Sequence, residues 1–371
     1  MRIDLREKYR YTLLGNWQGR SLSATHVFCD SDDGSVILNF TGGPVIQSED
    51  GGKTWGYYRG SRKWPPSDTG MFRQGDCLFA LYNGRRYKWS VDGGMTWCPE
   101  RLIPSVKDMH FSEIGDKNYF TAMMTLEGRI VVSGDYSLGK PDVDADVICV
   151  ASSGDWGASW EFSRLFGPAD PLPKAPEGFA EPAIVEMPNG YLWMVCRALY
   201  GELWQCISQD GGLTWNEPTP TGLASPISNC FAKRLPGSGA TVLCWNFIKP
   251  GPSTSPHDSP CVYRPRTNLV FAVSHDNCRT WSCPVLVEEH GGEYPTIHFT
   301  DEDMFIMYQS NPDEKTRPWG NRGLTLVRYD KKEVDSLPAW TTETIQPYID
   351  SGLVAHWLAM SCDQSRQKVI R

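Results

Sequence analysis

The sequence predicts an all-β protein, a six-bladed β-propeller built from four-stranded antiparallel blades. A short turn motif recurs five times along the 371 residues. Alternating, β-rich runs precede each copy of the motif, as expected for a four-stranded meander that repeats. The composition, with 35 Gly, 27 Pro and 15 Trp, is typical of many short strands and turns and argues against a helical bundle.

The turn motif reads S-x-D-x-G-x-T-W in its best copies. We find it at Ser48–Trp55, Ser90–Trp97, Ser152–Trp160, Ser208–Trp215 and Ser274–Trp281. The third copy contains an insertion in this alignment, and the fifth has Cys278 where Gly is expected. We expect the Asp to accept hydrogen bonds from turn amides and the Gly to take a positive φ. The Trp is expected to pack between neighbouring sheets.

Six units of about 62 residues account for the whole chain, which is a plausible size for elaborated blades. The fourth unit is the clearest, with AEPAIVEMPNG, YLWMVCRA and LWQCIS before its turn motif. The sixth reads EYPTIHFTDED, MFIMYQSN and GLTLVRYD and has no turn motif of its own. No linker divides the chain, so residues 1–371 are predicted as one propeller domain. Pro-rich stretches at 168–176 and 250–260 are expected to form long loops.

Composition excludes several classes of function. The formal net charge is −8 and no block of Lys and Arg occurs, so binding to nucleic acid or to an anionic membrane is not expected. No run of 18 apolar residues predicts a membrane span. The 12 Cys show no CxxC or metal-type spacing, so we expect buried, reduced thiols and neither a metal nor a cofactor. The charged N-terminus predicts a cytoplasmic protein, or a secreted one if the chain is a trimmed mature form.

The repeats resemble those of the sialidase (neuraminidase) superfamily, whose Asp-box motif has this pattern and whose fold is a six-bladed propeller. Three segments extend the resemblance beyond the turns. EPAIVEMPNGYLWMVCRA is similar to the blade that carries a catalytic Glu and a substrate-binding Arg, which implies Glu181 and Arg197. RTNLVFAVSHDNCRTW implies a carboxylate-binding Arg266, and EYPTIHFTDEDMFIMYQ implies a nucleophilic Tyr294. The Asp-box is structural and does not by itself prove an activity.

The repeat itself predicts that these residues converge. Aligning the blades with one another places Glu181-Pro182 on Tyr294-Pro295, each at the start of an innermost strand. Such starts line the central cavity on one face of a propeller. Asp135 and Arg197 end the second strands of their blades on that face, and Arg266 is predicted to open the third strand of the fifth blade. One face of the propeller is therefore expected to carry Asp135, Glu181, Arg197, Arg266 and Tyr294.

These residue types suit an exo-acting glycosidase for a terminal acidic sugar. Arg forks bind a carboxylate bidentately and stay charged at any useful pH. A neutral Tyr avoids the repulsion that an anionic nucleophile would meet from that carboxylate, and sialidases are known for this exception. A phenol with an ordinary pKa of about 10 needs a base, and Glu181 is the natural one. The expected partner is a carbohydrate with a carboxylate.

The first blade departs from the family pattern. Sialidases usually carry an Arg in an R-I-P element there, and the nearest match is Arg20, which lacks the Ile and Pro. They also place an acid/base Asp before the first Asp-box, but residues 34–47 contain neither Asp nor Glu. We take Asp135 as the substitute acid by its position, and Asp76 as a weaker candidate. Trp204 and Trp245 are candidates for stacking on a sugar ring.

Two other classes of function stay open. A propeller polysaccharide lyase, or a glycosidase for a uronate or another sugar, would use the same arginines. The lyase would take His26 or His110 with Tyr294 as base and acid. A non-catalytic glycan-binding propeller would have lost its acid altogether.

Overall fold

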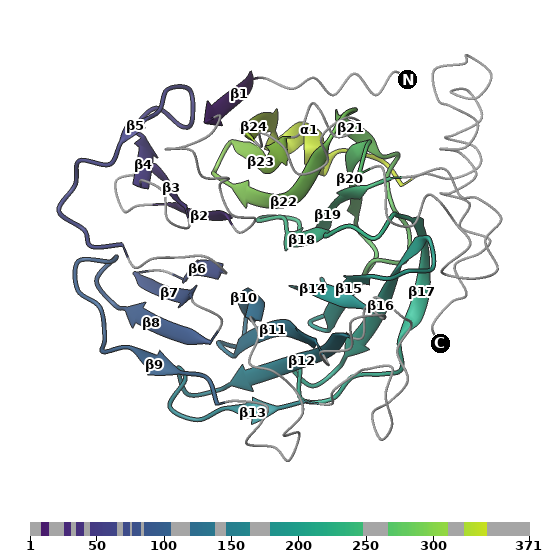
Figure 1. The fold of residues 1–371 in the computed structure, drawn as a ribbon, viewed down its shortest axis with the longest axis horizontal. Coiled ribbons are helices and arrows are strands. Elements are labelled where there is room, and N and C mark those ends of the chain that lie inside the picture. The colour runs from purple at the N-terminus through teal and green to yellow at the C-terminus, as the bar shows by residue number, and fades with distance from the viewer. Residues whose placement is uncertain are drawn as a thin grey trace.

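The computed structural model confirms an all-β, six-bladed propeller (Figure 1). Six four-stranded antiparallel sheets surround a central axis, and each of them is one blade. The structure describes residues 9–14, 26–30, 35–40, 45–64, 70–74, 76–82, 85–104, 119–137, 146–163, 179–247, 266–310 and 323–339. The Pro-rich stretches at 168–176 and 250–260 and the chain after 339 lie outside them, so the predictions made for these segments stay predictions.

The first three blades run along the chain from their innermost to their outermost strands. The first contains β2 (His26–Asp30), β3 (Val36–Phe40), β4 (Val45–Ser48) and β5 (Gly56–Tyr57). The second contains β6 (Gly70–Gln74), β7 (Cys77–Tyr82), β8 (Arg86–Ser90) and β9 (Arg101–Leu102). The third contains β10 (Tyr119–Met124), β11 (Ile130–Ser137), β12 (Asp146–Ser153) and β13 (Glu161–Phe162).

The remaining blades carry most of the predicted site. The fourth contains β14 (Ala180–Glu186), β15 (Leu192–Arg197), β16 (Glu202–Ser208) and β17 (Thr219–Ala224). The fifth contains β18 (Phe231–Arg234), β19 (Thr241–Asn246), β20 (Leu269–Ser274) and β21 (Val285–Glu288). The sixth contains β22 (Gly292–Phe299), β23 (Asp303–Ser310) and β24 (Gly323–Asp330).

The innermost strands β2, β6, β10, β14, β18 and β22 contact one another in sequence and close a ring around the axis (Figure 1). Each pairs antiparallel with the second strand of its own blade. The start of an innermost strand therefore lies on the same face of the propeller as the end of the second strand. We call this the site face.

The N-terminal strand closes the propeller, which the sequence did not predict. β1 (Tyr9–Leu14) pairs antiparallel with β24 and supplies the fourth strand of the sixth blade. Arg10 strengthens the closure, because its Nη1 donates to the Tyr308 hydroxyl at 2.5 Å and its Nη2 donates to the Val287 carbonyl at 2.5 Å. The sixth blade thus lacks a turn motif because its last strand comes from the other end of the chain.

The five turn motifs fold alike, and the third contains no insertion. It begins at Ser153 instead of Ser152, because the Ser153 hydroxyl accepts from the backbone N–H of Gly157 at 2.7 Å and donates to Asp155 at 2.8 Å. The same two bonds join Ser208 to Gly212 and Asp210. The predicted positive φ is confirmed at the four glycines of this position, and Cys278 adopts it too, with a φ of 59°.

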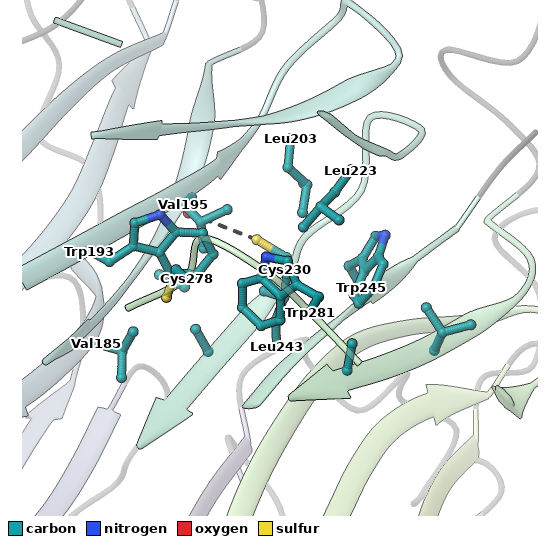
Figure 2. Close-up of a cluster of buried hydrophobic side chains, with 14 of the residues drawn as sticks. Val185, Trp193, Val195, Leu203, Leu223, Cys230, Leu243, Trp245, Cys278 and Trp281 are labelled. Atoms are coloured by element: carbon teal, nitrogen blue, oxygen red, sulfur yellow. Dashed lines mark hydrogen bonds between the residues drawn. The ribbon is translucent and has the colours of Figure 1, made fainter. Parts of the chain in front are cut away.

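Neighbouring blades pack through their strand faces, as expected for strands buried on both sides. In β11, Ile130 and Val132 pack toward the second blade, whereas Val131 packs toward the fourth. Between the fourth and fifth blades, Figure 2 shows a buried cluster that includes Trp193, Trp245 and Trp281. Burying each valine or leucine of this cluster contributes roughly 1.5–3 kcal/mol. These interfaces hold the inner strands, and with them the site face, in fixed register.

One short helix, α1 (Lys331–Asp335), follows β24, and the Asp330 side chain caps its N-terminus. Val334 of this helix is buried in the cluster between the fifth and sixth blades. Within the described ranges, the structure has no helix that is long and apolar enough to cross a membrane.

Candidate functional site

Two β-bulges with left-handed backbone conformation lie at the site face. The register of β14 shifts between Ala180 and Ala183, and that of β22 shifts between Glu293 and Thr296. Inside these shifts Glu181 has a φ of 51° and Tyr294 a φ of 52°. A non-glycine residue with a positive φ costs about 1–3 kcal/mol of conformational free energy. It persists where the surrounding structure holds it in that conformation. The predicted equivalence of Glu181 and Tyr294 is therefore confirmed in the backbone, whereas their positive φ was not predicted.

Asp135 supports the bulge at Glu181 from the neighbouring blade. Its Oδ2 accepts a hydrogen bond from the backbone N–H of Glu181 at 2.9 Å. Asp135 is 6% exposed and lies within β11, two residues before its end. It occupies the position in its blade that Arg197 occupies in the next, because each lies five residues after the first paired residue of its strand. The predicted equivalence of Asp135 and Arg197 is confirmed, but β11 continues to Ser137, so the prediction that Asp135 ends its strand was wrong.

Arg197 ends β15, as predicted, and its guanidinium lies beside Glu181. Its Nη1 is 3.0 Å from Glu181 Oε2, and both side chains are mostly buried. The two atoms do not have the alignment of a hydrogen bond, and the buried Nε of Arg197 has no hydrogen-bond partner. Burial lowers the pKa of Arg197, but the charges of Glu181, Asp135 and Tyr294 outweigh it and raise this pKa, while Arg266 opposes them. Four predicted residues therefore act on Arg197.

Arg266 is held more tightly than Arg197. Its Nη1 donates to Glu293 Oε2 at 2.5 Å and its Nη2 donates to the carbonyl of Ile227 at 3.3 Å. Its Cζ lies 5.4 Å from the centre of the Tyr294 ring. Burial lowers the pKa of Arg266, but Tyr294, through charge and a hydrogen bond, and Glu293 outweigh burial and raise it.

The prediction that Arg266 opens the third strand of the fifth blade was wrong. β20 begins at Leu269, whose partner Asn246 is the last residue of β19, so no strand partner remains for Arg266. Asn246 instead ties down the loop, because its Nδ2 donates to the carbonyls of Thr267 at 3.3 Å and Gly292 at 2.7 Å. This single amide joins the backbone beside Arg266 to the strand that carries Tyr294.

Sequence reasoning missed Glu293 and the bridging role of Asn246. Glu293 is 1% exposed and immediately precedes Tyr294. The repeat alignment places the small residue Ala180 at its position in the fourth blade, so the repeat carried no signal of a carboxylate. An acidic residue immediately before the predicted Tyr was the one sign available.

The other candidate residues named from the sequence lie away from these contacts or outside the described residues. Asp76 lies in the turn between β6 and β7, on the face opposite the site, with a side chain that is 82% exposed, so its candidacy as an acid was wrong. Trp245 is fully buried and donates to the Ala224 carbonyl, so it cannot stack on a sugar. Trp204 is partly buried and packs against Tyr200 at 5.8 Å between ring centres. Arg20, His110 and the side chain of His26 lie outside the described residues.

The described part of the chain contains no group of three or more His, Cys, Asp or Glu that could hold a metal ion. Its site face instead gathers three carboxylates, two guanidinium groups and one phenol. The carboxylates belong to Asp135, Glu181 and Glu293. Such a set can transfer protons and stabilise charge without a bound cofactor.

Comparisons with known proteins agree with this fold. The family model described as a BNR repeat-like domain matches residues 41–307. No curated protein matches the sequence. A protein of unknown function from Dyadobacter fermentans is similar in structure, with a TM-score of 0.60 and 16% identity, over 88% of this chain and 99% of that one.

Two solved glycosidase structures are also similar. Trypanosoma rangeli sialidase in complex with 2,3-difluorosialic acid, a covalent intermediate, has a TM-score of 0.54 and 14% identity over 83% of this chain. The match spans only 54% of the length of that sialidase. Penicillium chrysogenum α-L-arabinanase complexed with arabinobiose has a TM-score of 0.57 and 12% identity, over 89% of this chain and 99% of that one. At these identities the likeness establishes the fold alone.

Proposed function

The chain belongs to the BNR repeat-like domain family, and from that premise we propose that it is a glycoside hydrolase with Tyr294 as its nucleophile. The observation that carries the proposal is the pair of strained, equivalent bulges that bring Glu181 and Tyr294 to one face beside two arginines. Strain of this kind clusters at functional sites. The similar solved structures include a sialidase and an arabinanase, which act on sugars.

The first chemical step would form a glycosyl-tyrosine. The Tyr294 hydroxyl oxygen bonds to the anomeric carbon, and the bond from that carbon to the leaving oxygen breaks. The phenolic proton passes to the Glu181 carboxylate, so the nucleophile stays neutral until it attacks. This order suits a substrate whose anomeric carbon bears a carboxylate, because an anionic nucleophile would be repelled by it.

Asp135 is the proposed acid for the leaving group. It would give its proton to the departing oxygen in the first step and recover one in the second. In that second step water attacks the anomeric carbon, the bond to the Tyr294 oxygen breaks, and Glu181 returns the proton to the phenolate. The contact of Asp135 Oδ2 with the Glu181 amide supports a place for this carboxylate at the site.

A terminal acidic sugar, with sialic acid as the leading candidate, is the proposed substrate. Arginine is the side chain best suited to hold its carboxylate, and each such charged hydrogen bond contributes roughly 1.5–3 kcal/mol. The protein as a whole carries a formal charge of −8. This net negative charge repels an anionic sugar, so the binding site needs local positive charge. Arg197 and Arg266 are the described arginines of the site face.

The test is release of 4-methylumbelliferone from its α-sialoside by the purified chain. The proposal expects release that is lost in Tyr294→Phe. Release from a neutral glycoside but not from the sialoside would keep the hydrolase and reject the acidic sugar. New ultraviolet absorbance on a uronate polymer would instead indicate a lyase. Glycan binding without turnover, unchanged in Tyr294→Phe, would indicate a binding module.

A further inference from the structure

One buried amide, that of Asn246, contacts the backbone close to Tyr294 and close to Arg266. Asn246 is 0% exposed. Its Nδ2 donates to the carbonyl of Gly292 at 2.7 Å and to the carbonyl of Thr267 at 3.3 Å. Gly292 lies two residues before Tyr294 in β22, and Thr267 directly follows Arg266. The amide therefore ties the start of the sixth blade to the loop that carries Arg266.

Ser228 fixes the orientation of this amide. Its side chain is fully buried, and its hydroxyl donates to Asn246 Oδ1 at 2.5 Å. Because the amide oxygen has this partner, the nitrogen faces the two carbonyls. The neighbouring residue Ile227 adds a second link, since its carbonyl accepts from Arg266 Nη2 at 3.3 Å. A buried polar network whose members are all paired is rigid.

The fifth blade repeats a support that the third blade also has. Asn246 and Asp135 each lie five residues after the first paired residue of the second strand in their blade. Each binds the backbone where the innermost strand of the next blade begins. Asp135 accepts from the N–H of Glu181, whereas Asn246 donates to the carbonyl of Gly292. Both bulges of the site are therefore held by the equivalent side chain of the preceding blade.

The bulge at Tyr294 needs such a support. Its φ of 52° is strained for a non-glycine residue and persists only where the surrounding structure holds it. Relaxation of this residue to a negative φ would turn its side chain out of its present direction. A misplacement of about 1 Å in a reacting group lowers a rate by roughly 10²-fold.

We propose that Asn246 is a positioning residue for the nucleophile, holding the strained bulge of Tyr294 through the Gly292 carbonyl. It is fully buried, so it contacts neither the substrate nor the reacting atoms. The inference rests on the proposed function and deepens it. A group that aligns the nucleophile, and does not bind the sugar, should contribute to kcat more than to KM.

The experiment measures kcat and KM for 4-methylumbelliferyl α-sialoside, together with amide hydrogen exchange across residues 292–296. Asn246→Asp keeps the shape of the side chain and the acceptor for Ser228, but it removes the N–H donors. Ser228→Ala and Ser282→Ala form a matched pair, because both serines are 0% exposed. Ser282 lies toward the opposite face, where it bonds to the Val273 amide near the end of β20.

We expect Asn246→Asp to lower kcat by roughly 30-fold or more and to leave KM within about threefold. Ser228→Ala should lower kcat only about threefold, because the donors of Asn246 remain. Ser282→Ala should lower thermal stability about as much as Ser228→Ala and leave kcat unchanged. Exchange across residues 292–296 should quicken in Asn246→Asp and Ser228→Ala but not in Ser282→Ala.

Three results would overturn the positioning role. They are a kcat for Asn246→Asp within about twofold of the unmodified chain, a raised KM with no fall in kcat, and unchanged exchange across residues 292–296. If Asn246→Asp does not fold, equal kcat values for the two serine variants would overturn it. No hydrolysis by the unmodified chain would refute the proposed function and the catalytic part of the inference. The exchange measurement would then still decide whether Asn246 holds the bulge.

Discussion

The fourth and sixth blades use the same backbone device to present different chemistry. Each innermost strand begins with a left-handed bulge followed by proline, at Glu181-Pro182 and at Tyr294-Pro295. They differ in the residue just before the bulge, which is Ala180 in one blade and Glu293 in the other. Where that residue is alanine, the nearby Arg197 makes no aligned hydrogen bond with Glu181, and where it is glutamate, its carboxylate accepts a hydrogen bond from Arg266 at 2.5 Å. The repeat thus supplies the backbone geometry, and differences between equivalent residues change the side chains presented on it.

The largest effect is expected from removing the hydroxyl of the sixth-blade bulge. Tyr294→Phe keeps the ring against Arg266 but removes the proposed nucleophile, so kcat should fall by roughly 10³-fold or more. The measurement is steady-state hydrolysis of the fluorogenic sialoside. Tyr191→Phe is the matched control, because Tyr191 is an exposed tyrosine in the β14–β15 turn on the opposite face. Equal activity of the two variants would reject Tyr294 as the nucleophile.

Removing the carboxylate of the fourth-blade bulge should lower kcat by a smaller factor. Glu181→Gln removes the proposed base, which is worth about 10²–10⁴-fold in rate for such groups, and we expect the lower part of that range. Glu127→Gln, in the exposed turn between β10 and β11, is the control. Equal kcat values for Glu181→Gln and Glu127→Gln would reject Glu181 as the base.

Asp135 joins the third blade to the fourth, and its two proposed tasks can be separated. As the leaving-group acid, Asp135→Asn should slow hydrolysis of a sialoside with a poor leaving group about tenfold more than that of the 4-methylumbelliferyl sialoside. As a support for the Glu181 amide alone, it should slow both substrates equally. The ratio of the two rate constants is the measurement. An equal loss would leave Asp135 as a positioning residue and require another acid.

The smallest expected effect is on thermal stability. It concerns the turn motif of the fourth blade, which the sixth blade lacks. Burial raises the pKa of Asp210, but hydrogen bonds from Thr214 and Ser208 outweigh it and lower this pKa. The contribution of Asp210 is therefore complete above the unfolded value of about 4 and is lost as pH falls through the lower folded pKa.

We expect Asp210→Asn to lower Tm by roughly 2 °C at neutral pH, about the effect of losing a capping residue in a protein of this size. Asparagine does not titrate, so the difference from the unmodified chain should shrink below pH 4. Thermal unfolding from pH 7 to pH 2.5 measures it. A difference that stays constant across this range would show that the carboxylate charge of Asp210 contributes nothing.

The features that depend on periodicity were predictable from the sequence. The blades, their turn motifs and the equivalence of Glu181 and Tyr294 all follow from one repeated pattern. The features that break the repeat were not predictable. β1 joins the sixth blade from the far end of the chain, where no local pattern marks it. Glu293 occupies the position that Ala180 has in the fourth blade. Its partner Arg266 belongs to another blade, so only the folded chain brings the two together.

The central claim is that Tyr294 attacks the sugar, and trapping the glycosyl-enzyme tests it most directly. The chain would be incubated with 2,3-difluorosialic acid, digested with a protease and mapped by mass spectrometry. We predict one added sugar on the peptide that contains Tyr294, and no label in Tyr294→Phe. A label on Glu181 or Asp135 would contradict the account, as would turnover of the sialoside by the enzyme with no label on Tyr294.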